Sequence, residues 1–464
     1  MLTLTDSRKG LGRRDFLHIG GLGLGGLTLS DLLQTQTQAA NGPSFLRDKS
    51  VVFLFMHGGP SQIETFDPKM TAPPGIHSVN GEVATRIPGI TFGSTLKKLS
   101  ALNDQFSIVR SFVTGDGRHD IKPIVSRHTA DANLGSIYSR VAGANRSDTG
   151  MPTNVALYPR AVDPKAQPAN MNFGKFGSPG GFGTAFSPFV PGGGGDMQSN
   201  MQLKLPRTRL TDRQLLLQQL DGIRRLADES GAIDGLSRFR QQAFDTILGG
   251  AADAFDLSKE DPRTLERYDT ARILGPDDIS KKWNNYNNYC DNAKTLGHLL
   301  LLARRLCERG CGFVTVTTNF VWDMHSDVNN AGVEEGMRYM GIPFDHAVSA
   351  FLEDVAARGL SEKILLVCCG EMGRTPRINK NGGRDHWGGL APLMLAGGGL
   401  KMGQVVGQSA RDAGTPLTRP YQISDLVATV LHTLFDTGEL RLVRGISRDV
   451  TRIIESGNPI SELV

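Results

Sequence analysis

The segment from Ile364 to Trp387 constrains the fold of this chain most strongly. It begins with six consecutive apolar residues, ILLVCC, and such a run is typical of a strand buried on both faces of a parallel sheet. The run ends at Gly370, and Glu371 and Arg374 follow at once. Ligands of open α/β sheets bind beside the carboxyl ends of their strands. The segment therefore predicts an α/β fold and also the edge at which its site lies.

Strand and helix patterns alternate along the rest of the chain. This alternation predicts a three-layer α/β sandwich, with a mostly parallel central sheet and helices on both faces. Pro343 suits the first turn of one of the helices. The expected strands are 49–56, 106–112, 313–317, 364–369 and 393–396, and the expected helices are 133–141, 211–229, 237–248, 293–309, 343–358 and 424–435.

Charge and composition exclude several classes of protein. The net charge of +4 is small for 464 residues and there is no long Lys/Arg run, so we expect no nucleic-acid partner. No apolar window of about 20 residues occurs beyond the N-terminus, so we expect no transmembrane span in the mature chain. The five cysteines have no spacing typical of a zinc site, and we expect no disulfide framework.

The N-terminal 40 residues are expected to be a targeting signal. Arg13 and Arg14 precede Phe16, Leu17 and a weakly apolar, glycine-rich stretch, a pattern that resembles a twin-arginine export signal. The alternative is an amphipathic helix, which the many glycines disfavour. We therefore expect the twin-arginine export machinery as a partner and a periplasmic or secreted location.

The mature chain, 41–464, is predicted to form a single domain. The segment 172–196 is rich in Gly, Phe and Pro, so it is either a lid over a site or a surface loop. A helical insertion is expected at about 211–300.

Side chains capable of catalysis or of metal binding follow the expected strands. Imidazole and carboxylate groups together suit divalent ions such as zinc or manganese, and an arginine can bind an anionic ester with two hydrogen bonds. The candidates for metal binding are His57, Asp323, His325, Glu371, Asp385 and His386, and those for catalysis are Ser61, His119, His128, Arg374 and Arg384.

Each candidate also has a structural interpretation. His57 can stabilise the turn after the first strand, and Ser61 can cap a helix or a turn. Glu371 and Arg374 can form a partly buried ion pair that holds their loop. The case for a site rests on all of these residues converging.

Several motifs together resemble one bacterial family. They are HGGPSQIETFDPK (57–69), ARRLCERGCGFVTV (303–316), WDMHSD (322–327), LLVCCGEMGRTPRINKNGGRDHW (365–387) and LMLAGGGLKMGQVVG (393–406). Their order and content are similar to those of the exported family known as domain of unknown function 1501, which in turn resembles the alkaline phosphatase and sulfatase superfamily.

The resemblance implies a phosphatase- or sulfatase-like fold with a one-metal or two-metal site. Asp323 and His325 then match one metal-binding pair, Glu371 a later carboxylate and His386 a final histidine. Met372 stands where the superfamily has a metal-binding histidine. The implied cofactor is a divalent ion (zinc, manganese or calcium), and the implied substrate is an anionic ester, such as a sulfated or phosphorylated carbohydrate.

Two functions remain open from the sequence. The first is an exported, metal-dependent hydrolase of phosphate or sulfate esters. The second is a non-catalytic exported binding or envelope protein with a degenerate site, which the loss of histidine at position 372 favours.

Overall fold

The computed structural model describes residues 45–192, 251–443 and 445–464, and its centre is a seven-stranded sheet. The strand order is β11-β4-β10-β7-β1-β6-β5. Four neighbours, β7, β1, β6 and β5, are parallel, β10 is antiparallel to both of its neighbours, and β11 is parallel to β4. The strands are β1 Ser50–Phe55, β4 Ser107–Val109, β5 Asn154–Leu157, β6 Phe313–Val316, β7 Ile364–Cys369, β10 Leu393–Gly397 and β11 Val405–Val406.

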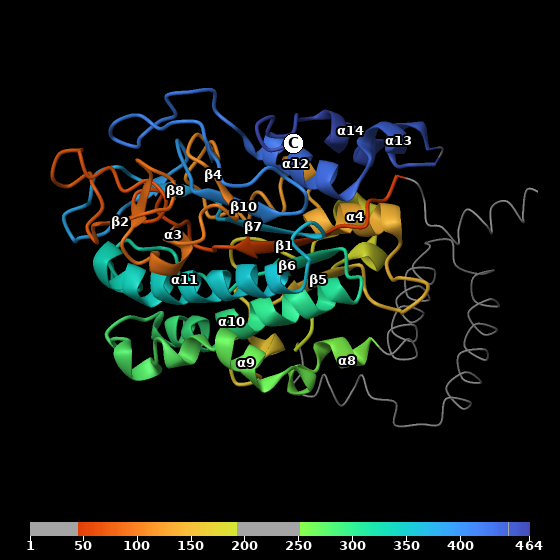
Figure 1. The fold of residues 1–464 in the computed structure, drawn as a ribbon, viewed down its shortest axis with the longest axis horizontal. Helices are drawn as coiled ribbons and strands as arrows, with labels where there is room; N and C mark the ends of the chain where they lie inside the picture. Colours follow the sequence, from red (N-terminus) through yellow and green to blue (C-terminus); the bar gives the residue numbers. More distant parts are fainter. Residues whose placement is uncertain (1–44, 193–250, 444) are drawn as a thin grey trace, which may run out of the picture.

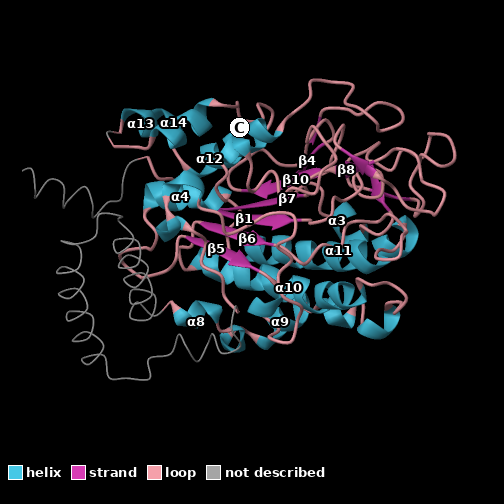
Figure 2. Ribbon diagram, turned by 180° about the vertical axis from the view of Figure 1, so that it is seen from behind, coloured by secondary structure: helices cyan, strands magenta, loops and turns pink. Residues whose placement is uncertain are grey.

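Helices cover both faces of this sheet, which confirms the predicted three-layer α/β sandwich. One face carries the two longest helices, α10 and α11, with α8 and α9 beyond them and α3 beside α11, and the other face carries α4, α12, α13 and α14 (Figures 1 and 2). The first group is α3 Lys97–Ser100, α8 Ala252–Phe255, α9 Pro262–Tyr268, α10 Tyr286–Glu308 and α11 Val333–Ala357. The second is α4 Leu134–Ala142, α12 Ile423–Leu434, α13 Thr437–Leu442 and α14 Arg448–Glu455.

Strand β1 shows how the two hydrophobic cores form. All six of its residues are buried, and their side chains point alternately to the two faces. Val52 and Leu54 belong to the core under α10 and α11, whereas Val51 and Phe53 belong to the core under α4 and α12. A continuous apolar run is therefore required at the centre of the sheet, as it was predicted for β1 and β7.

Two small antiparallel pairs lie outside the main sheet. Strand β2, Glu82–Ala84, pairs with β3, Thr91–Gly93. Strand β8, Gly373–Arg374, pairs with β9, His386–Trp387, so that Arg374 faces His386 in the register. Three residues separate the end of β7 from the second pair, which positions the loop between its strands at the carboxyl edge of the sheet.

The helix expected to begin at Pro343 begins ten residues earlier. Helix α11 runs from Val333, and Pro343 lies inside it, so the expected position in the first turn is wrong. The missing N–H of a proline costs one helical hydrogen bond. Here Val333, Met337 and Met340 are buried against the core, and this apolar packing keeps the first ten residues helical.

Most other boundaries differ little from expectation, but helix α10 begins at Tyr286, seven residues before the predicted start at 293, and β4 is shorter than the predicted strand 106–112. The predicted helices 211–229 and 237–248 lie outside the described residues, as do the N-terminal 44 residues and the end of the glycine-rich segment. The five cysteines are all buried and free. Among the described residues, no helix has the length and apolar character needed to cross a bilayer.

Candidate metal centre

Side chains from three separated segments converge at the carboxyl edge of the sheet. His119 follows β4, Asp323 and His325 follow β6, and His386 is in β9. One ligand atom from each of these four residues lies within 4.8 Å of the ligand atoms of the other three. We call these four residues the His/Asp cluster.

One carboxylate oxygen, Asp323 Oδ1, is the common point of the cluster. It lies 3.5 Å from His119 Nε2, 2.9 Å from His325 Nε2 and 3.3 Å from His386 Nε2. The Nε2 atoms of His325 and His386 are 2.7 Å apart. His119 Nε2 is buried and has no hydrogen-bond partner. An orphaned ring nitrogen beside two other ring nitrogens and a carboxylate is the donor set of a metal site, so the residues present fit a divalent ion.

Arg374 and the three histidines stabilise the charge on Asp323. The Nη2 atom of Arg374 donates to Asp323 Oδ1 over 2.6 Å. Burial acts to raise the pKa of Asp323, but the guanidinium and the hydrogen bonds from the histidines hold this pKa well below its usual range. This shift favours the ionised carboxylate, which is the form that binds a metal ion.

Outer partners orient three of the four cluster residues. Glu371 Oε1 lies 2.9 Å from Nδ1 of His119, and Asp385 Oδ1 lies 3.2 Å from Nδ1 of His325. Asn330 donates from Nδ2 to Asp323 Oδ2 over 3.2 Å. A carboxylate on the far nitrogen of a histidine fixes the ring and directs Nε2 inward, which is the usual arrangement around bound metals.

His119 is held between two carboxylates. Burial acts to lower its pKa, but the carboxylates of Asp323 and Glu371, beside its two ring nitrogens, raise the pKa above its usual value. Glu371 itself is fully buried and accepts hydrogen bonds from the backbone N–H of Gly58, at 2.9 and 3.2 Å. The first turn of the chain after β1 therefore positions Glu371, and Glu371 positions His119.

Close backbone approach at Gly58 makes this arrangement possible. Gly58 has φ of +113°, and a Cβ atom there would lie 2.6 Å from the backbone nitrogen of Asp323. Only glycine fits such a position without a shift of the backbone. The turn after β1 can thus pack directly on the segment after β6, and two backbone N–H groups of that segment, from Val321 and Trp322, donate to the carbonyl of His57.

His57 lies beside the cluster rather than in it. Its ring is 1% exposed and contacts four phenylalanine rings, and its Nε2 atom has no hydrogen-bond partner. Burial lowers the pKa of His57 to about 4, against the attraction of Glu371. The structure therefore holds a neutral imidazole in an aromatic surrounding at this position, whereas the sequence predicted a metal ligand. The rings are Phe55, Phe173, Phe176 and Phe320, with centroids 5.0–5.8 Å from that of His57.

The glycine-rich segment contributes to this aromatic surrounding. Phe173 stacks on Phe320 with centroids 4.4 Å apart, and the His119 ring lies 5.1 and 4.6 Å from the two. The start of the segment, at Phe173, thus lies beside the cluster, while Pro179 and Phe189 form bridges to Ala132 and Val155. The Phe content of the sequence was the signal for these contacts, but nothing in the spacing indicated the partner Phe320.

The two arginines predicted to bind an anion are used by the protein itself. Arg374 and Arg384 are both fully buried, and an arginine has five N–H donors. Arg374 donates to the carbonyls of Gly58, Gly59, Trp322 and Arg384, to Asp323 and to the ring of His325. Arg384 donates to Glu64 and to the carbonyls of Thr375, Pro376, Ile76 and His77. Neither guanidinium has a donor left for an anion, so the anion-binding role expected for them is not supported.

Ser61 and His128 are not brought into the cluster. Ser61 is buried and its hydroxyl accepts a hydrogen bond from the backbone N–H of Glu64 at 3.3 Å, which is the turn-capping role that the sequence left open. His128 lies in a short 3₁₀ helix that packs on α12, and its ring contacts Arg127. Glu371 and Asp385 were predicted as ligands, but they contact the outer ring nitrogens of His119 and His325. Met372 is fully buried against Gly59.

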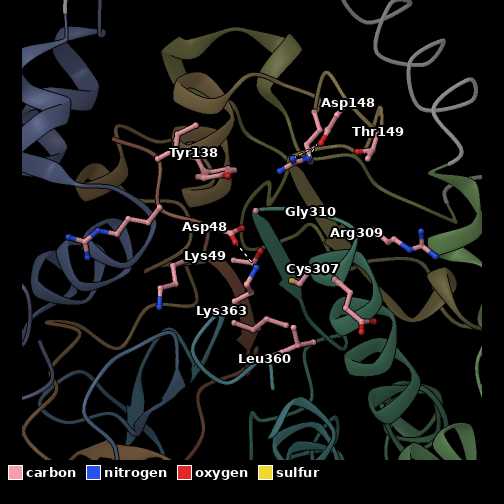
Figure 3. Close-up of a pocket in the computed structure, with 17 residues that line it drawn as sticks. Asp48, Lys49, Tyr138, Asp148, Thr149, Cys307, Arg309, Gly310, Leu360 and Lys363 are labelled. Carbon is pink, nitrogen blue, oxygen red and sulfur yellow. Dashed lines mark hydrogen bonds and ion pairs between the residues drawn. The ribbon is translucent and has the colours of Figure 1, made fainter. Parts of the chain in front are cut away.

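A cavity of about 550 Å³ lies at the opposite edge of the sheet, where β1, β6 and β7 begin (Figure 3). Its charged groups are largely paired, with Lys363 2.5 Å from Asp48 and Arg146 2.7 Å from Asp148. In the part of the chain that the structure describes, the His/Asp cluster is the one group able to hold a metal ion, and it is not in this cavity.

Comparison with solved structures finds distant similarities. The chain is similar to the PsFucS1 sulfatase from Pseudoalteromonas sp., with 10% identity and a TM-score of 0.37 over 92% of this chain and 75% of that one. It is also similar to the lipoteichoic acid synthase LtaP from Listeria monocytogenes, with 8% identity, a TM-score of 0.30 and coverage of 85% and 74%. For the phosphonate monoester hydrolase of Agrobacterium radiobacter these values are 12%, 0.26, 89% and 78%.

No curated protein matches the sequence. A family model does match, with the description "Protein of unknown function (DUF1501)", and it spans residues 48–464. This match covers the whole sheet, all of the described helices and the His/Asp cluster. The chain is therefore a member of the DUF1501 family.

Proposed function

We propose that this protein is an exported, metal-dependent hydrolase of sulfate or phosphate esters. The observation that carries the proposal is the convergence of three imidazole nitrogens on one ionised carboxylate oxygen at the carboxyl edge of the sheet. A divalent ion held by His119, Asp323, His325 and His386 would polarise the ester oxygens as a Lewis acid.

The chain's own residues hold and orient this centre. Glu371 and Asp385 fix the rings of His119 and His325, and Arg374 offsets the charge of Asp323. In residues 45–192, 251–443 and 445–464, no hydroxyl or thiol side chain is hydrogen-bonded to any of the four cluster side chains. We therefore propose that water is the attacking group, without a covalent intermediate on Ser, Thr or Cys.

The proposed substrate is a sulfated or phosphorylated carbohydrate, and the proposed location is the periplasm or the exterior. Phe173, which is partly exposed, presents an aromatic ring beside His119, and such a ring supplies an apolar face against which a sugar can pack. Export by the twin-arginine route is proposed from the pair Arg13 and Arg14 and the glycine-rich stretch after it, which lie outside the described residues.

The proposal is tested with the purified protein loaded with zinc or manganese, assayed on 4-nitrophenyl sulfate, 4-nitrophenyl phosphate and a panel of sulfated oligosaccharides. We expect ester hydrolysis that a chelator abolishes and that His386→Ala abolishes. His128→Ala is the matched control, since His128 lies away from the cluster and this variant is expected to retain activity. Hydrolysis that survives both chelation and His386→Ala would refute the proposal.

A second candidate is a metal-containing binding protein without catalysis. The observation in its favour is that the N–H groups of Arg374 and Arg384 are hydrogen-bonded to other groups of the described residues. Neither arginine is therefore free to bind an anionic ester. A metal-loaded protein that binds sulfated glycans in calorimetry but hydrolyses none of the panel would establish this candidate in place of the first.

A further inference from the structure

We infer that the His/Asp cluster is a mononuclear site for a divalent transition ion with a preference for imidazole ligands, zinc above all, and not a calcium, magnesium or two-metal site. The inference deepens the proposed function by naming the ion and its number. It concerns metal binding by the His/Asp cluster and not the ester substrate, so it can be tested separately from the hydrolase activity.

The donor set excludes the hard cations. Calcium takes six to eight oxygen ligands and magnesium demands an octahedron of oxygens with several waters. The cluster offers three ring nitrogens, from His119, His325 and His386, and one carboxylate oxygen from Asp323. Imidazole suits zinc and its neighbours in the first transition row, whose affinity for such donors rises from manganese to copper and remains high at zinc.

The ring orientations select the same class of ion. Nδ1 of His119 is engaged by Glu371 and Nδ1 of His325 by Asp385, so that the Nε2 atoms of both rings face the shared carboxylate oxygen. The Nε2 atoms of His325 and His386 lie 2.7 Å apart. A carboxylate behind a histidine raises the basicity of the inward nitrogen, which strengthens its bond to a transition ion.

Arg374 takes the place that a second cation would need. Its guanidinium contacts the same oxygen of Asp323 that faces the three histidines, and the other oxygen of Asp323 accepts from Asn330. Glu371 accepts from Gly58 on both oxygens, and Asp385 Oδ1 accepts from Asn379. Both oxygens of Asp323 and both oxygens of Glu371 are therefore already engaged by groups of the protein.

The charges agree with a single divalent ion. Three carboxylates, those of Asp323, Glu371 and Asp385, lie on the cluster or directly behind its histidines. Their negative charge equals the combined positive charge of one divalent ion and the Arg374 guanidinium. A second divalent ion would leave this partly buried centre with an uncompensated charge of +2, which is unfavourable where the charge is removed from water.

The experiment measures metal content and coordination without substrate. The full-length protein is stripped with a chelator, dialysed against equal concentrations of Zn²⁺, Mn²⁺, Mg²⁺ and Ca²⁺, and analysed by inductively coupled plasma mass spectrometry. We expect one transition ion per chain, with zinc dominant. In a parallel Co²⁺ titration, we expect visible d–d absorption that saturates at one equivalent.

Variants separate a specific site from adventitious binding. His386→Ala removes a ligand at a partly exposed position, and we expect zinc to bind at least about 100-fold more weakly, the upper end of the range for losing an outer-shell partner. His128→Ala is expected to bind zinc as the wild type does. Two ions per chain, retention of calcium in place of zinc, or wild-type zinc affinity in His386→Ala would each overturn the inference. One bound zinc in a protein that hydrolyses no ester would sustain it and refute the proposed function alone.

Discussion

The buried ion pair between Arg384 and Glu64 offers a sharp test of how the GRDHW loop is held. Both side chains are 0% exposed. Glu64 Oε1 accepts from Nε and Nη2 of Arg384 at 3.1 and 2.8 Å. Its other oxygen accepts from the hydroxyl of Ser78 at 2.8 Å and the amide of Asn80 at 3.1 Å. Burial lowers the pKa of Arg384, and Glu64 opposes this shift.

Removing one charge of the pair leaves the other buried and uncompensated. Glu64→Gln keeps the shape of the side chain but removes the negative charge and presents an amide N–H to groups that are all donors. Breaking a buried pair in this way costs about 3–5 kcal/mol of unfolding free energy. That is a large part of the total stability of a typical protein, about 5–15 kcal/mol. Arg384→Met is expected to cost a similar amount, because it leaves Glu64 and four backbone carbonyls without their donor.

The double variant is the informative measurement. When Glu64→Gln and Arg384→Met are combined, neither charge remains, and we expect the loss to be smaller than the sum of the two single losses by about 1–3 kcal/mol. Unfolding free energies come from urea denaturation followed by tryptophan fluorescence. Zinc content is measured on the same samples.

Two results would contradict this reasoning. The first is a Glu64→Gln variant whose unfolding free energy stays within about 0.5 kcal/mol of the wild type, the range expected of an ordinary surface change. The second is an Arg384→Met variant that keeps its stability but loses affinity for sulfate or phosphate. The latter would restore the anion-binding role that the sequence predicted for Arg384.

Two further predictions follow from named contacts. Glu371→Gln keeps an oxygen for the Gly58 N–H but removes the charge behind His119, so we expect zinc affinity, measured by calorimetry, to fall about 10–100-fold; unchanged affinity would contradict the role of Glu371. Burial raises the pKa of Asp345 from 3.8 to about 6, against hydrogen bonds from two backbone N–H groups of α3. Because the folded pKa is the higher one, this carboxyl group favours folding at low pH, and that contribution is lost as the pH rises through 6. We expect the loss between pH 4 and pH 7 to be about 3 kcal/mol in the wild type and absent at this site in Asp345→Asn. Equal pH slopes of the unfolding free energy in the two proteins would contradict this prediction.

The sequence was sufficient for the architecture because apolar patterning is a local property. The buried run 364–369 and the similar run in β1 could only be strands covered on both faces, and the alternation with helices required crossovers over the sheet. The start of α11 was misjudged because Pro343 looks like a helix start by itself, while the packing of Met337 and Met340 that overrides it comes from distant parts of the chain.

The sequence also predicted the edge of the sheet at which the site lies, but it could not assign roles within the site. Asp323, His325 and His386 were expected as ligands, and their ligand atoms converge. His119 was expected as a catalytic residue and His57 as a ligand, yet the ring of His119 joins the cluster and that of His57 does not. Both histidines follow strands that end at the same edge, so no pattern along the chain distinguishes them.

For Arg374 and Arg384, too, the sequence predicted the position of the residue but could not assign its role. Their position after β7 and in the following loop is legible in the sequence, and a free guanidinium there would bind an anion. Whether a donor is free depends on which backbone carbonyls surround it, and those belong to residues up to 316 positions away along the chain.

The sequence by itself thus determined the layered α/β fold, its two apolar cores and the edge that carries polar side chains, because strand burial and helix periodicity act over a few neighbouring residues. Only the tertiary structure decided which nitrogen faces which oxygen. In the structure Glu371 and Asp385 orient the rings of His119 and His325, although the sequence predicted them as metal ligands. Arg374 and Arg384 donate their hydrogen bonds to carbonyls and carboxylates of the protein itself. These assignments depend on distances of about 3 Å between segments that are far apart in the chain, and a hydrogen bond or a metal bond is lost within an ångström of displacement.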